Sequence, residues 1–327
     1  MRNQFTIYCY RFVLAACCAL LLTGCGKEKR TEEERASIEE IRQQGITAYG
    51  QGDYEAALTA FREGIEACGA VTDELYGDLF CYCGACLYEE QAYEEAIESF
   101  ETAICYASEE SLDDAYLMEG CCYVALGDEN AAATLFEACI GTGRADFDAY
   151  CCMYRSFKEA GFQERAESYL KRLISAEDSS NLLIGKCYYY LGSFSDAKTF
   201  LEKSMDEGER EAVYFLALDL EAMEDYDRTE EFYQTELTKL PDDATLYNQY
   251  GAYLIRREAY EKALEVIEEG LALEADEETA QALSYNEAVC YEYLSDYAKA
   301  EELMEAYVAL YPEDDAAAKE LMFLRSR

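Results

Sequence analysis

The sequence predicts an all-α protein built from stacked helical hairpins, and three observations support this fold class. A small residue recurs eight times at intervals of about 35 residues. A large apolar residue follows it by four places, and a glycine or alanine usually precedes it by twelve. The chain of 327 residues has only 2 prolines, and both lie twelve places after the recurring residue. The recurring residues are Ala57, Ala96, Ala132, Ala166, Ala197, Thr229, Ala263 and Ala300.

Each of these spacings has a physical meaning in a helical hairpin. Apolar residues four and eight places after the small residue share one face of a helix, as Phe61 and Ile65 do after Ala57. The small residue beside them allows a second helix to approach closely. The earlier glycine, Gly45 in the first unit, is expected on that preceding helix and facing the contact. Each unit therefore reads as two helices packed through small residues.

Turn residues stand between the two expected helices of each unit. Glycine suits a left-handed helix end, and aspartate or serine caps the next helix, as in Gly52-Asp53. Pro241 and Pro312 follow second helices and stop them from continuing. The other turn pairs are Gly127-Asp128, Gly161-Phe162, Gly192-Ser193, Glu224-Asp225 and Ser295-Asp296.

This pattern resembles the tetratricopeptide repeat, a helix–turn–helix unit of about 34 residues. The resemblance covers residues 37–313 as about eight units, and residues 314–327 are expected to form a capping helix over the last one. It is weaker where Glu129 and Gln163 replace an aromatic residue, and at Thr229. Helical repeats of longer period are the alternative. The matching stretches include Gly45-x6-Gly52-Asp53-Tyr54-x2-Ala57-x3-Phe61 and Gly251-x8-Tyr260-x2-Ala263.

The resemblance implies a right-handed α-solenoid whose first helices line a concave surface. In this family that surface binds peptides or partner proteins and performs no catalysis of its own, although fold alone does not fix function. The family's concave positions fall here on cations and aromatics, which suit an acidic or C-terminal peptide segment. Alternatively, they only solvate the groove or pair with acids such as Glu159 and Glu221. The positions are Arg155, Lys158, Lys186, Tyr189, Tyr190, Tyr214, Asn248, Arg256, Tyr285 and Tyr293.

The amino terminus reads as an export signal, residues 1–24. Arg2 and Arg11 give it positive charge, and the apolar run Phe12–Leu22 is too short to span a bilayer of about 30 Å. The following Leu22-Thr23-Gly24-Cys25 resembles the lipobox of bacterial lipoproteins, which implies cleavage after Gly24 and acylation of Cys25. Residues 25–36 then read as a polar tether. The alternative is that Cys25 is an ordinary thiol.

Charge and composition exclude several functional classes. With 69 acidic against 27 basic residues, the net charge of −42 disfavours nucleic acid or an anionic membrane surface as partner. The absence of histidine removes Ser–His and Cys–His catalysis. No calcium loop, phosphate loop or paired catalytic carboxylates appear, so we expect no enzyme and no cofactor.

The 16 cysteines raise the question of metal or redox chemistry. The sharpest candidate is Cys81-x-Cys83-x-x-Cys86, because clustered thiolates hold zinc and iron–sulfur centres. We favour packing, because Cys86, Cys122, Cys187 and Cys290 all lie ten places before the recurring small residue. At such a position cysteine acts as a small hydrophobic residue. A metal site, or a disulfide involving Cys151 or Cys152, stays open.

The sequence thus predicts a membrane-anchored lipoprotein that acts as a protein–protein interaction scaffold in a bacterial cell envelope. It would sit on the outer face of the cytoplasmic membrane, or in the periplasm where an outer membrane exists, and contact the membrane through its lipid only. The alternative is a solute- or glycan-binding lipoprotein that serves a transporter or cell-wall enzyme. A module that only spaces other parts is a further alternative.

Overall fold

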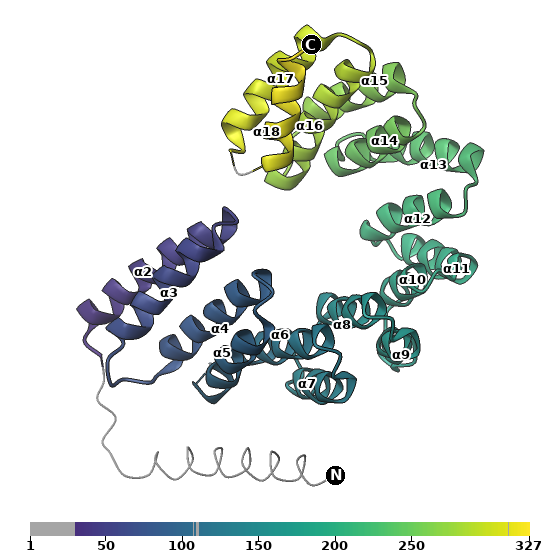
Figure 1. Ribbon diagram of the computed structural model, residues 1–327. Helices are drawn as coiled ribbons and strands as arrows, with labels where there is room; N and C mark the ends of the chain where they lie inside the picture. Colours follow the sequence, from purple (N-terminus) through teal and green to yellow (C-terminus); the bar gives the residue numbers. More distant parts are fainter. Residues whose placement is uncertain (1–29, 107, 109–110, 313) are drawn as a thin grey trace. The chain divides into compact units, whose positions relative to one another are not determined.

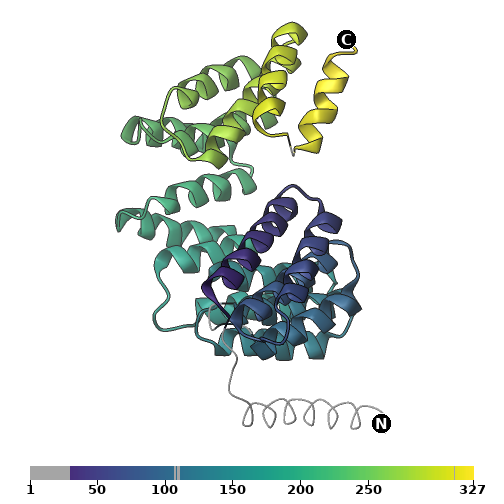
Figure 2. The ribbon, with the colours of Figure 1, turned by 90° about the vertical axis from the view of Figure 1, so that its left-hand side faces the viewer.

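The computed structural model describes residues 30–106, 108, 111–312 and 314–327, which contain α-helices and no β-strand. The chain forms two compact units, residues 1–149 and 150–327. Within each unit consecutive helices run antiparallel and pack as hairpins (Figures 1 and 2). The predicted fold class, an all-α array of repeated hairpins, is confirmed.

The helices follow one another in the order that the repeat predicts, with α8 crossing from one unit to the other. The described part of residues 1–149 contains α2 (Glu32–Gly50), α3 (Tyr54–Ala67), α4 (Glu74–Glu89), α5 (Tyr93–Tyr106), α6 (Leu112–Ala125), α7 (Glu129–Gly141) and the start of α8 (Phe147–Glu159). The remaining helices are α9 (Gln163–Ile174), α10 (Asn181–Tyr190), α11 (Phe194–Asp206), α12 (Glu211–Ala222), α13 (Tyr226–Lys239), α14 (Ala244–Arg256), α15 (Tyr260–Leu271), α16 (Glu277–Tyr293), α17 (Tyr297–Leu310) and α18 (Asp315–Leu324).

Each hairpin is held together where the first helix lacks a side chain. A Cβ added to Gly45 of α2 would lie 2.5 Å from the Phe61 ring of α3, and one added to Gly120 of α6 would lie 2.3 Å from Phe136 of α7. Phe61 and Phe136 are fully buried, so neither ring has free space to move into. The same contact joins Gly84 to Phe100, Gly185 to Leu201 and Gly251 to Ile267.

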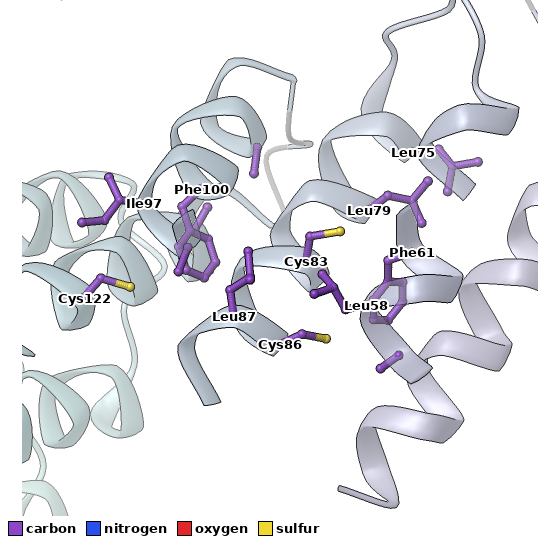
Figure 3. Packing of buried hydrophobic residues seen from close by; sticks show 14 of the residues in the cluster. Leu58, Phe61, Leu75, Leu79, Cys83, Cys86, Leu87, Ile97, Phe100 and Cys122 are labelled. Carbon is purple, nitrogen blue, oxygen red and sulfur yellow. The ribbon is translucent and has the colours of Figure 1, made fainter. Parts of the chain in front are cut away.

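The recurring alanines and the large residues four places later form the interior of the array. Figure 3 shows this in residues 1–149, where Phe61 and Phe100 are buried on either side of α4. Leu79 and Cys83 of α4 lie in the same cluster. The Phe61 ring also stacks on Tyr82, with ring centroids 4.9 Å apart. Within residues 1–149, neighbouring hairpins from α2 to α6 therefore share one apolar cluster instead of each having its own core.

The turns confirm most of the predicted caps. Gly52 has φ +72°, and Asp53 accepts a hydrogen bond from the backbone N–H of Ala56 (3.0 Å). Asp128 and Asp296 cap α7 and α17 in the same way. Ser193 and Asp225 make no side-chain cap, and the Asp225 carboxylate pairs instead with Arg228. Among the described residues, the non-glycine residues Gln91, Glu224, Glu258 and Ser295 also adopt the left-handed conformation.

At the amino-terminal side the first helix begins earlier than expected. Thr31 caps α2 in a capping box: it accepts from the backbone N–H of Glu34, and the Glu34 side chain accepts from the backbone N–H of Thr31. These hydrogen bonds lower the pKa of Glu34. Residues 32–36 of the predicted tether 25–36 are therefore helical, because acidic side chains stabilise a helix amino terminus.

The final helix α18 packs against α17, as the predicted capping helix would (Figure 2). Ala317, Leu321 and Leu324 of α18 are buried in one cluster with Met304 of α17. The cap is joined to α17 by a hydrogen bond from the Tyr307 hydroxyl to Asp314 (2.8 Å). The apolar face of the last repeat is thus covered by residues of the chain itself.

We predict that alanine is not tolerated at the glycine that meets the large residue. Gly45→Ala should destabilise the protein by about 1–3 kcal/mol, because its Cβ overlaps the buried Phe61 ring. The matched control in the same helix is Gly50→Ala, which has no atom within 4 Å and should be neutral or stabilising by up to about 1 kcal/mol. Urea unfolding followed by circular dichroism measures both. Equal effects of the two substitutions would contradict the packing described here.

Candidate partner-binding surface

The ten predicted groove residues lie on the first helices of successive hairpins. Arg155 and Lys158 are on α8, Lys186, Tyr189 and Tyr190 on α10, Tyr214 on α12, Asn248 and Arg256 on α14, and Tyr285 and Tyr293 on α16. All ten belong to residues 150–327, so each is described within that unit. Side-chain contacts connect these helices in sequence, and they show which side chains are already engaged.

On α8 two cations stand three residues apart without a carboxylate partner. Arg155 and Lys158 are both exposed, and no described carboxylate lies within ion-pair distance of either. The ammonium of Lys158 donates to the Tyr154 hydroxyl (2.9 Å), which in turn donates to the backbone carbonyl of Tyr190 (2.7 Å). Buried Tyr154 therefore connects α8 to α10 and positions Lys158 at the surface.

On α10 and α12 the predicted tyrosines form an aromatic patch, and the predicted cation Lys186 is paired with an acid. The Lys186 ammonium pairs with Glu211 at 2.6 Å and lies 5.0 Å from the centre of the Phe215 ring. Tyr189 and Tyr190 both pack against Phe215, with ring centroids 5.9 and 6.4 Å away. Lys186 is thus committed to a contact between two repeats, although Tyr189 and Tyr190 keep partly exposed faces.

Between α12 and α14 the surface carries a buried acid with two donors. Asp243, 4% exposed, accepts from the Tyr214 hydroxyl (2.8 Å) and pairs with Arg210 (2.6 Å). Burial and the adjacent Asp243 carboxylate raise the pKa of Tyr214 to about 12, so the phenol stays protonated and remains a donor. Asp243 also caps α14 by accepting from the backbone N–H of Leu246.

Arg256 is likewise occupied. Its guanidinium pairs with Glu221 of α12, and the same carboxylate accepts a hydrogen bond from the buried Tyr233 hydroxyl (2.7 Å). The alternative in which groove cations pair with acids such as Glu221 therefore holds at Arg256. Within the described residues, Glu159 forms no ion pair with a groove cation.

The remaining predicted residues, Asn248, Tyr285 and Tyr293, contact side chains of α15, α16 and α17. Asn286 donates to the Asn248 side chain (3.0 Å), and Tyr285 packs edge-on against Tyr307. Tyr293 is 59% exposed and stacks on Tyr260 at a centroid distance of 4.5 Å. Most predicted groove residues therefore bridge one repeat to the next. The exposed members of the set are Arg155, Lys158, Arg256 and Tyr293, and of these cations only Arg256 pairs with a described carboxylate.

Sequence reasoning missed the side chains that hold this surface in place. Tyr154 and Asp243 are not among the predicted surface residues. The spacing of thirty-some residues between partners, such as Tyr154 and Tyr190, follows the repeat period and would have been a usable signal.

The cysteines at the predicted repeat position are buried, which supports packing as their role. Cys86, Cys122, Cys187 and Cys290 have no exposed surface, and burial raises the pKa of each thiol to about 12. Among the described residues, no group of three or more His, Cys, Asp or Glu side chains is arranged to hold a metal ion. A buried, protonated thiol is a poor nucleophile and a poor metal ligand.

The predicted acylation site, Cys25, lies outside the described residues. In the part of the chain that the structure describes, none of the helices combines the length and the apolar character needed to cross a membrane.

Comparison with protein families identifies the repeat in three stretches of the chain. Residues 42–111 and residues 113–142 each match a tetratricopeptide repeat model. The chain is a tetratricopeptide-repeat (TPR) protein. Residues 214–324 match the middle TPR-like domain of cilia and flagella-associated protein 70. TPR families are typically non-catalytic scaffolds.

Several solved structures are similar to this chain at low sequence identity. A TPR protein from Parabacteroides merdae ATCC 43184 is 15% identical, over 76% of this chain and 97% of that one, with a TM-score of 0.42. The TPR2AB-domain:pHSP90 complex of yeast Sti1 is 15% identical, over 88% of this chain and 97% of that one, with a TM-score of 0.34. MamA is 19% identical, over 51% of this chain and 96% of that one, with a TM-score of 0.35. No curated protein matches the sequence.

We predict that the buried thiols of this TPR protein are inaccessible until it unfolds. In the native state, a thiol-specific aromatic disulfide reagent at about pH 8 should leave Cys86, Cys122, Cys187 and Cys290 unmodified, because their pKa values lie far above that pH. In denaturant all four should react, and mass spectrometry of tryptic peptides assigns each thiol. Rapid native-state labelling of these four, or zinc bound stoichiometrically, would contradict the packing role.

Proposed function

We propose that this TPR protein captures an acidic peptide segment, such as a carboxylate-bearing C-terminus of a partner protein, on its first-helix surface. The observation that carries this proposal is the pair Arg155 and Lys158. In a chain with 69 acidic and 27 basic residues, both cations are exposed and bonded to no carboxylate. Cations in such an acidic chain ordinarily acquire an acidic neighbour, as Lys186 and Arg256 do.

The surroundings of this pair suit a peptide. The Tyr154 hydroxyl holds Lys158 against α8, so little side-chain freedom is lost when the ammonium binds a carboxylate. Tyr190 and Phe215 on the next two first helices supply apolar area beside it. Aromatic side chains beside cations are a common composition for binding extended segments, because the rings contribute contact area at low entropic cost. Binding of peptide or protein partners is also the usual activity of TPR domains.

We expect charge reversal at this pair to abolish binding of an acidic peptide. The probe is a fluorescent octapeptide that contains four glutamates and a free C-terminal carboxylate, measured by anisotropy at low salt. Arg155→Glu combined with Lys158→Glu should weaken binding at least about tenfold, because two attractive contacts become repulsive.

The matched control is Lys319→Glu combined with Arg327→Glu, which changes the net charge equally on α18 and at the residues that follow it. This control should leave binding nearly unchanged, and a C-terminally amidated peptide should bind the wild-type protein more weakly. Equal loss in both double variants would show a general charge effect and contradict the assigned surface.

We further propose that the protein is an exported lipoprotein, anchored through Cys25 to the outer face of the cytoplasmic membrane. The supporting sequence is the order Arg2 and Arg11, Phe12–Leu22 and Leu22-Thr23-Gly24-Cys25. Removal of residues 1–24 takes away two arginines and no acid, so the mature body is more negative still. Anionic headgroups repel such a body, which leaves the lipid as its membrane contact.

Lipidation is tested by labelling bacterial cells that express the full chain with an alkyne fatty acid. We expect the wild-type protein to carry label and to sediment with membranes, since two acyl chains give stable anchoring. Cys25→Ala should lose the label, whereas the control Cys105→Ala, at an exposed position on α5, should keep it. Unlabelled wild-type protein in the soluble fraction would contradict the anchor but not the peptide-binding proposal.

The alternative of a solute- or glycan-binding protein finds less support in the described residues. Such a ligand favours an enclosed, mainly apolar pocket with a few polar groups. A cleft of about 570 Å³ between α11, α12 and α13 is lined by Leu216, Leu220 and Phe232 but also by five charged residues. These charged residues are Lys198, Glu202, Asp206, Arg228 and Glu231.

A further inference from the structure

The sixth hairpin, α12 with α13, differs from the other repeats in its interior. Asp219 occupies the position that is cysteine in four other repeats, and it has no exposed surface. Thr229 replaces the recurring alanine and is also fully buried. Glu236, 5% exposed, stands seven places after Thr229, where the first and seventh repeats have Gly64 and Gly270. Three polar side chains therefore lie inside one hairpin.

Two of these three polar groups are satisfied locally. The Thr229 hydroxyl donates to the backbone carbonyl of Asp225 (2.9 Å), one turn earlier in the same helix. Glu236 pairs with Lys239 at 2.7 Å. Asp219 is different, because neither of its carboxylate oxygens receives a hydrogen bond from any described residue. An ionised carboxylate in that position is strongly unfavourable, because it has lost its water and gained no donor.

The helices packed around α12 do not supply the missing charge. On α11 the Lys198 ammonium favours the ionised form of Asp219, but Lys198 itself lies 3.6 Å from Glu202. On α10 the nearby titratable group is Tyr189, a neutral phenol whose pKa is raised by burial. On α13 and α14, Tyr233 and Arg256 both contact Glu221, and Glu236 pairs with Lys239. Arg228 and Glu231 of α13 line the adjacent cleft, and Arg228 pairs with Asp225.

Solvent also has a nearby route to this hairpin. The cleft of about 570 Å³ is bounded by α11, α12 and α13, and Leu216 and Leu220 of α12 form part of its lining. Asp219 lies three residues after Leu216, about one helical turn along the same side of α12. A small separation of α12 from its neighbours would therefore bring water to the carboxylate.

We propose that the α12–α13 hairpin is a pH-controlled opening in the repeat array: it is closed while Asp219 is protonated and opens toward the adjacent cleft when the carboxylate ionises. The proposal rests on the fully buried Asp219 carboxyl, which receives no hydrogen bond from any described residue. Among the described hairpins, α12–α13 alone has an acid at the position that is cysteine in four other repeats. Opening exposes Leu216, Leu220 and Phe232 and hydrates the carboxylate in the same movement.

The direction of the pH effect follows from the difference in the pKa of Asp219 between the closed and the open hairpin. Burial raises the pKa of Asp219 to about 7, against an ordinary value of 3.8. The closed hairpin therefore holds the proton more tightly than the open one, so closure is most favourable below the ordinary pKa. It weakens as the pH rises toward the raised pKa and changes little beyond it. Between about pH 5.5 and pH 8 the equilibrium constant for opening should increase about 30-fold.

Hydrogen–deuterium exchange measured by mass spectrometry on the full chain tests this. Peptides from α12 and α13 are compared at both pH values between the wild-type protein and Asp219→Cys, which installs the residue of the other repeats. The ratio of exchange rates at each pH cancels the intrinsic pH dependence of exchange. We expect wild-type exchange to exceed that of the variant by a factor that grows about 30-fold between the two pH values.

Two further variants keep the test decisive. Asp219→Asn preserves the side-chain shape and should also remove the pH dependence, so it replaces the cysteine variant if that variant fails to fold. Asp227→Asn removes an exposed acid from the same hairpin and should behave as the wild-type protein. The proposal is overturned if the wild-type-to-variant ratio is constant with pH, or if Asp227→Asn abolishes the pH dependence as fully as the Asp219 variants do.

Discussion

The structure depends on one contact that recurs along the chain: a large side chain of the second helix lies where the first helix has only a hydrogen or a methyl group, except in the α8–α9 hairpin, which has Tyr154 there. In five of the hairpins the residue on the first helix is glycine, and a Cβ there would overlap Phe61, Phe100, Phe136, Leu201 or Ile267. Close approach of the backbones follows, and with it the short turns and the small residues beside them. Cysteine at Cys86 or Cys187 fits the same requirement, being small, apolar and wholly buried.

Because the second helices bury their large residues against the first, the remaining face of each first helix is left to connect successive repeats. Lys186 with Glu211, Arg256 with Glu221 and Tyr214 with Asp243 all serve this purpose. Partly buried pairs of this kind fix the register of neighbouring hairpins more than they add stability. Arg155 and Lys158 stand apart because they are exposed cations without an acid, and the proposed peptide surface rests on that difference.

The repeated part of the fold was predictable because it follows from spacing within one hairpin. The sequence offsets from Ala57 predict that Gly45 lies against Phe61, and the pair Gly52-Asp53 predicts the turn between the two helices. The partners of the groove residues were less accessible to sequence reasoning, since a pair such as Lys186 and Glu211 depends on the relative rotation of two hairpins. Glu258, which takes the left-handed turn conformation without glycine, and the capping box at Thr31 show that local chemistry also departs from the repeat pattern. Asp219 was visible only as an exception to a cysteine position, and its burial without a donor required the structure.

The central claim is that the absent side chain at the glycine and the bulk of its partner are one interaction. A double-mutant cycle on Gly120 and Phe136 measures this directly, using urea unfolding of the two single variants and the double variant. The contact predicts that Gly120→Ala is harmful in the wild-type background but nearly neutral once Phe136→Ala has made room, with a coupling energy of at least about 1 kcal/mol. Additive effects within about 0.3–0.5 kcal/mol would show that the two residues act independently and would contradict the account.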